Sequence, residues 1–194
     1  MKIEIAETQI LPLAAAIQNI IAATDAVSAT QLQIDLAVRE SEKEADKVAE
    51  LGSVELPSAK QVNELLISRE RRSIMDATAT KFAVQLDAQK QTAVRSMGAG
   101  YEVFRQTAGE QLTSGTKREL IDSLPPSVRN DSHLVQAIVT GSQQVRSLGM
   151  FLNPPGPSPR DDSGTILAEA ARILALLRDL EAGNDIAFIQ PPAR

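Results

Sequence analysis

The chain carries few side chains that could do acid–base or nucleophilic chemistry. Its 194 residues include one histidine and no cysteine. His133 follows Asp131 at a spacing that would suit a general base with an orienting carboxylate. The same two residues also fit the first turn of a helix that Asp131 caps. A zinc site needs three or four ligands from His, Cys and carboxylates, so the composition argues against one. We therefore expect no catalytic residue, metal or cofactor.

Two glycine motifs and one carboxylate pair deserve the same scrutiny. Gly109–Lys117 has the outline of a phosphate-binding loop, but five residues rather than four separate its glycines, and no predicted strand supports it. Gly98–Gly100 lacks the third glycine and the strand of a dinucleotide-binding fingerprint, so we interpret it as a hinge between helices. Asp161 and Asp162 are the closest carboxylate pair, and a helix cap is their simpler role. These motifs favour a protein that is not an enzyme.

Charge and hydropathy disfavour two classes of partner. The net charge of −5 and the pI near 5.0 argue against nucleic acid as the main partner, because phosphate binding needs a basic surface. The most apolar short run, Leu11–Ala23, contains Gln18 and Asn19 and is too short to cross a bilayer. Acidic residues Glu4 and Glu7 near the start are untypical of a secretory signal. We expect no membrane span.

A long first helix is the element beside which the rest of the chain must pack. Between Leu13 and Leu51 there is no proline or glycine, and alternate steps of four and three residues reach eleven positions, eight of them apolar. That spacing is typical of a coiled-coil seam, and the helix would be roughly 58 Å long. The eleven positions are Leu13, Ile17, Ile20, Thr24, Val27, Gln31, Ile34, Val38, Ser41, Ala45 and Val48.

A second long segment, Ser58–Met97, is also free of proline and glycine. The short gap between the two segments predicts an antiparallel helical hairpin over residues 13–97. Arg69, Arg71 and Arg72 form the only tight basic cluster. We expect them to pair with the acidic residues 40–50 across the hairpin, and the alternative is an acidic partner from another subunit.

Shorter elements complete an elongated helical domain over residues 1–152. Within residues 99–152 we expect a helix ended by Gly115, a second over Lys117–Leu124, and a third that runs on through Gly141 to Leu152. Residues 2–11, which alternate at first, predict a short strand or an extended arm, and residues 185–189 predict a second short strand at the other end of the chain. Pro12 is expected as the first residue of the first helix.

A proline-rich spacer separates this domain from a C-terminal unit over residues 164–194. Residues 153–163 contain four prolines, a composition typical of an extended polyproline segment. The helix that follows, about Gly164–Ala182, has an apolar face too wide to stay exposed. We expect it to bind a neighbouring chain, because a stiff spacer is needless for a local return; the alternative is its own hairpin. The expected partner-binding residues are Ile166, Ile173, Leu174, Leu177 and Leu180.

The sequence thus predicts an all-α protein that works in multiple copies. Its evidence is apolar seam in excess of what one hairpin buries, few catalytic residue types and extended ends. We expect a structural or assembly subunit of a bacteriophage virion, such as a portal, neck, tail or internal protein, bound to itself and to other proteins of the particle. One alternative is an axial or scaffold component of a bacterial secretion or flagellar structure. Another is an adaptor or chaperone in the bacterial cytoplasm that binds a partner helix in a groove.

Overall fold

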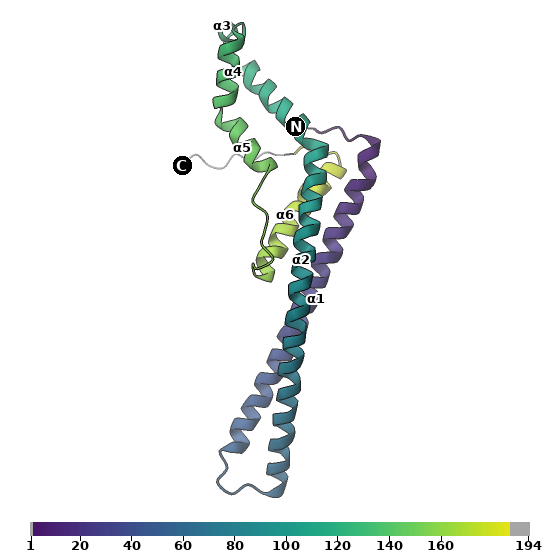
Figure 1. Cartoon of the computed structure of the whole chain (residues 1–194), viewed down its shortest axis with the longest axis vertical. Helices are drawn as coiled ribbons and strands as arrows, with labels where there is room; N and C mark the ends of the chain where they lie inside the picture. The colour runs from purple at the N-terminus through teal and green to yellow at the C-terminus, as the bar shows by residue number, and fades with distance from the viewer. Residues whose placement is uncertain (1, 187–194) are drawn as a thin grey trace.

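The computed structural model describes residues 2–186 and shows an elongated all-α molecule over that range (Figure 1). The hairpin turn lies at one end of the long axis and α3 lies at the other. The helices are α1 (Glu7–Gly52), α2 (Ala59–Ser123), α3 (Pro126–Arg129), α4 (Ser132–Gly141), α5 (Gln143–Leu152) and α6 (Ser163–Glu181).

The predicted antiparallel hairpin is confirmed, and both of its helices are longer than expected. α1 begins at Glu7, so Pro12 lies inside the helix and is not its first residue. A proline this close to a helix start removes one backbone hydrogen bond, and the turn before it still forms. Ser58 caps α2: its side chain accepts from the Gln61 backbone amide, and the Gln61 side chain accepts from the Ser58 backbone amide.

The predicted hinge at Gly98–Gly100 is wrong, because α2 passes through both glycines and continues to Ser123. The predicted helix end at Gly115 and the separate helix after it are wrong for the same reason. A glycine inside a helix costs only about 1 kcal/mol relative to alanine. At Gly100 the packing explains the residue, since a Cβ there would lie 2.6 Å from Ile20 Cδ1 and 3.3 Å from Leu177 Cδ1. The glycine lets three helices approach closely.

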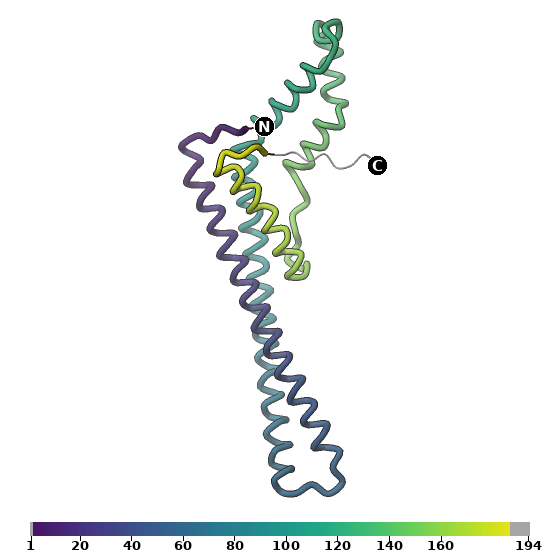
Figure 2. The backbone as a smooth tube through the Cα atoms, turned by 180° about the vertical axis from the view of Figure 1, so that it is seen from behind, coloured from purple at the N-terminus to yellow at the C-terminus, as the bar shows by residue number. Residues whose placement is uncertain are grey.

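The main core lies where α6 packs against both helices of the hairpin, in the half of the molecule away from the hairpin turn (Figure 2). Among the largest fully buried side chains are Leu13 and Ile20 from α1, Met97 and Phe104 from α2, and Leu177 from α6. The N-terminal half of the predicted seam is therefore buried as expected. A second column at seven-residue spacing is buried beside it: Ala16, Ala23, Thr30, Ala37 and Glu44.

The helices after α2 fold back along its end. Asp131 caps α4 as predicted, accepting from the amides of His133 and Leu134. The single helix predicted through Gly141 is wrong, because Ser142 adopts an extended backbone and separates α4 from α5. α5 brings Phe151 edge-on to Phe104, with ring centroids 6.0 Å apart.

The two ends of the described chain meet. Lys2 and Asp185 form an isolated antiparallel bridge, and Ile3 and Ile186 are buried nearby. Gln111 on α2 holds this end by donating to the Glu4 carbonyl at 2.7 Å and accepting from its amide at 2.9 Å. Within residues 2–186 this bridge does not extend into a strand. Residues 7–11 of the predicted first strand are helical. Residues 187–189 of the second lie outside the described part.

Candidate interaction surface of the helical arm

The structure places the predicted partner-binding residues against the chain's own hairpin. Ile166, Ile173, Leu177 and Leu180 are at most 3% exposed, and Leu174 is half-buried against the same core. Binding of another chain through these side chains would require α6 to leave its place. Partner binding through α6 stays a prediction. Among the described residues, the large apolar side chains that are already exposed lie on other elements.

The spacer explains why α6 can return to its own chain. Asn153 and Arg105 line the same cleft, and Lys90 Nζ donates to the Asp161 carbonyl at 2.9 Å. The stretch of α2 between residues 90 and 105 is roughly 22 Å long at a rise of about 1.5 Å per residue. Seven residues of polyproline type span about the same length. The spacer therefore runs alongside α2 and delivers α6 to the groove between α1 and α2.

The distal half of the hairpin has no third helix against it. Ser163, at the start of α6, bonds the Gln31 side chain at 2.9 Å, which marks the limit of α6 on α1. We call residues 32–89, beyond that limit, the arm; Figure 1 shows it as a bare two-helix hairpin. Its seam is mostly small and polar: Ala37, Ser41, Glu44 and Ser68 are buried there, and Leu86 is the one large apolar side chain buried within residues 32–89. Ser41 Oγ donates to Asp76 Oδ1 at 2.5 Å across the two helices.

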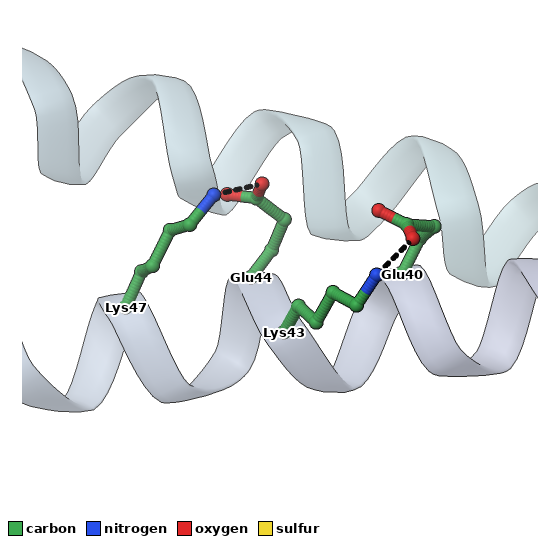
Figure 3. Close-up of polar contacts among 4 residues, drawn as sticks. All are labelled: Glu40, Lys43, Glu44 and Lys47. Carbon is green, nitrogen blue, oxygen red and sulfur yellow. Dashed lines mark hydrogen bonds and ion pairs between the residues drawn. The ribbon is translucent and has the colours of Figure 1, made fainter.

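Glu44 is the buried charge of this seam, with 7% of the residue exposed. Lys47 Nζ donates to Glu44 Oε1 at 2.7 Å, and the other oxygen, Oε2, is also buried. The hydrogen bond from Lys47 is the main reason that the pKa of the Glu44 carboxyl is lowered. Figure 3 shows Lys47 and Lys43 each reaching back along α1 to a carboxylate, Glu44 and Glu40 respectively. A seam of this kind contributes little apolar burial to holding the two helices together.

Charges on the arm are segregated between its helices. Residues 35–52 of α1 carry six acidic and three basic side chains, whereas residues 60–81 of α2 carry five basic and three acidic ones. Every ion pair within the described arm joins residues of one helix: Lys43–Glu40, Lys47–Glu44, Lys60–Glu64 and Arg72–Asp76. No ion pair within the arm therefore joins the acidic stretch of α1 to the basic stretch of α2.

The predicted ion pairing of the arginine cluster across the hairpin is wrong. Arg72 lies 3.9 Å from Asp76 on its own helix. Arg71 acts on Glu44 only as a more distant charge that helps to lower the pKa of that carboxyl. The Glu44 carboxylate instead accepts a hydrogen bond from Lys47 on its own helix. Arg69 and Arg71 are exposed.

Large apolar side chains also stand exposed on the arm. Leu32 and Leu36 lie one turn apart on α1, with 60% and 52% of each exposed, and Ile67 and Ile74 lie seven residues apart on α2, with 39% and 53% exposed. Helical spacing places each pair on one face of its helix. Single exposed apolar residues are ordinary, but successive ones along a bare hairpin make the arm a candidate contact surface.

The other candidate sites have no supporting geometry. The Asp131 carboxylate bonds backbone amides, one of them that of the exposed residue His133, and so acts as a helix cap. No group of three or more His, Asp or Glu side chains in the described part of the chain could hold a metal ion. Gly109–Lys117 is a continuous helical stretch of α2. It therefore forms no loop whose backbone amides could bind a phosphate.

α1 raises the question of a membrane span again. It contains an 18-residue window with a mean hydropathy of 1.5, and 33% of that window is buried inside the structure. By length and composition it could cross a bilayer, and the core helix of a soluble protein passes the same test. The sequence-based expectation of no span therefore stays a prediction.

Sequence and fold were compared with known proteins. No protein-family model, curated protein or solved structure matches the chain.

Proposed function

We propose that this protein is a non-enzymatic structural subunit that assembles in multiple copies, and that the arm is a contact between copies. The observation that carries the proposal is the arm itself: a bare hairpin with exposed apolar side chains and with segregated charges that form no ion pair between its two helices. A two-helix hairpin with a polar seam gains stability when a second pair of helices covers it, as in a four-helix bundle. A second copy of the arm supplies such a pair.

The charge pattern selects one arrangement of two arms. Two hairpins can stack face to face about a two-fold axis that runs either along the arm or across it. An axis across the arm places α1 against α1 and opposes two acidic helices. An axis along the arm places the acidic α1 of each copy against the basic α2 of the other, which is electrostatically favourable. We propose the second arrangement, with both arm tips at the same end.

The proposed particle is a bacteriophage virion, and the alternative is an axial structure of a bacterial secretion or flagellar apparatus. Support for both is general: slim helices filled by aliphatic residues, with one tyrosine, four phenylalanines and no tryptophan in the chain. Electron microscopy of assembled protein separates them, since a portal or neck subunit closes into rings and an axial subunit extends into filaments.

Light scattering of the purified protein tests the contact. The mass should be a multiple of the 20.8 kDa chain mass. Reversing charge on α2 (Arg69→Glu with Arg71→Glu) should lower the mass to that of one chain. Reversing it on α1 (Glu42→Lys with Asp46→Lys) should do the same. An equimolar mixture of the two variants restores complementary pairs in both α1–α2 contacts, so it should assemble again.

A matched control lies outside the arm. Lys117→Glu with Arg118→Glu makes the same change in net charge as the α2 variant, at two exposed positions near the end of α2. It should leave the mass unchanged. A wild-type chain that is monomeric at micromolar concentration contradicts the proposal. So does a mixture of the α1 and α2 variants that stays monomeric.

A further inference from the structure

A cleft of about 470 Å³ opens between α2, the spacer and α6, and none of its lining residues belongs to the arm. Its volume falls within the range of small-molecule sites in proteins. Val94 and Met97 of α2 and Ile173 of α6 supply apolar lining, and Leu152, Pro154 and Pro157 supply more. The polar lining residues are Tyr101, Glu102, Arg105, Asn153 and Glu169.

The wall formed by the spacer is held in place before any ligand binds. The Tyr101 hydroxyl donates to the Phe151 carbonyl at one end of the spacer. At the other end Lys90 bonds the Asp161 carbonyl, and the Ser158 amide donates to Asp161 Oδ2 at 2.8 Å. The intervening prolines have fixed φ angles. A preformed wall lowers the ordering cost of binding.

The charges at the cleft are already satisfied. Arg105 Nε and Nη2 donate to the two Glu102 oxygens at 3.0 and 2.9 Å. Arg172 Nε and Nη2 donate to the two Glu169 oxygens at 2.9 and 2.6 Å. Its guanidinium also lies 5.7 Å from the centroid of the Tyr101 ring. Paired groups of this kind offer little to a charged ligand, and a charged ligand would lose part of its own hydration against the apolar part of the lining.

Two glycines belong to the lining. Gly98 and Gly156 both line the cleft, and a Cβ built on either would meet no other atom within 4 Å. Neither has a positive φ, so a larger side chain can replace each glycine and enter the cleft without backbone strain. We propose that this cleft binds an uncharged, mainly apolar small molecule, which contacts α2, the spacer and α6 together. The site does not depend on assembly through the arm.

Fluorescence titration with N-phenyl-1-naphthylamine, an uncharged apolar probe, tests the site on the full chain. The wild type should bind one probe per chain saturably. Gly98→Leu fills the cleft and should weaken binding by about ten-fold or more. Gly149→Leu is the matched control, because Gly149 is also a helical glycine with no atom within 4 Å of its Cβ but does not line the cleft. It should bind like the wild type.

Two further measurements keep the test decisive. If Gly98→Leu loses its helical circular dichroism, Gly156→Leu fills the cleft from the spacer instead and should weaken binding as strongly. The sulfonated analogue 1-anilinonaphthalene-8-sulfonate should bind the wild type more weakly than the uncharged probe. Non-saturable binding, equal binding by the cleft-filling variants, or tighter binding of the sulfonate would each overturn the proposal.

Discussion

Gly98 and Gly100 are two residues apart on one helix, and alanine at each should have opposite effects on stability. Both substitutions gain about 1 kcal/mol of helix propensity. At Gly98 the new methyl group meets no atom within 4 Å, so the gain should be kept. At Gly100 it would lie 2.6 Å from Ile20 Cδ1 and 3.3 Å from Leu177 Cδ1. Both of those side chains are fully buried and must shift.

The difference between the two variants isolates the packing term. Inserting a methyl group into a packed core typically costs about 1–3 kcal/mol. Because the propensity gain is common to both sites, Gly100→Ala should be less stable than Gly98→Ala by about the same 1–3 kcal/mol. In a chain of this size each kcal/mol shifts the melting temperature by roughly 2–4 °C.

Urea unfolding followed by circular dichroism measures the difference, with thermal unfolding as a second measurement. If Gly100→Ala is as stable as Gly98→Ala or more so, the close approach of α1, α2 and α6 at Gly100 is refuted. The hinge predicted from the sequence would then again explain this glycine. A lower stability of Gly98→Ala than of the wild type would show that its surroundings are not open.

Two further expectations concern α6 and the cleft. Leu177→Ala should cost about 2–5 kcal/mol of unfolding free energy, because Leu177 is fully buried. Leu174→Ala, at a half-buried position, should cost less. A fall in assembled mass without a loss of chain stability would instead place α6 on another chain. Tyr101 is the only tyrosine, so an ultraviolet titration reports it alone. Burial raises its pKa in the folded chain, and phenolate should therefore form at higher pH in the native protein than in urea. Stability from this group is complete below the unfolded pKa of about 10 and is lost as pH rises through the folded value. Ionisation at the same pH in both states would contradict this account.

The sequence alone determined the fold class and the hairpin. The 3.5-residue spacing of apolar side chains in α1, the uninterrupted run after Ser58 and the short turn between them are local patterns, and local patterns decide where helices form. The cap at Asp162, which accepts from the Thr165 amide, was readable for the same reason. The buried column from Ala16 to Glu44 has a seven-residue period that the sequence also contains, but small side chains give it little hydrophobic signal.

Tertiary structure decided the roles of the glycines, of α6 and of the arginine cluster. Gly98 and Gly100 have the same local signature, yet one faces open space and the other meets α1 and α6, because only packing distinguishes their two sides of α2. The apolar face of α6 required burial, but the sequence could not specify the surface that covers it. The spacer decided which surface covers α6, because it runs alongside α2 and brings α6 back to the groove between α1 and α2. Likewise, Arg71 acts on Glu44 only as a nearby charge. The Glu44 carboxylate accepts its hydrogen bond from Lys47, one turn along α1.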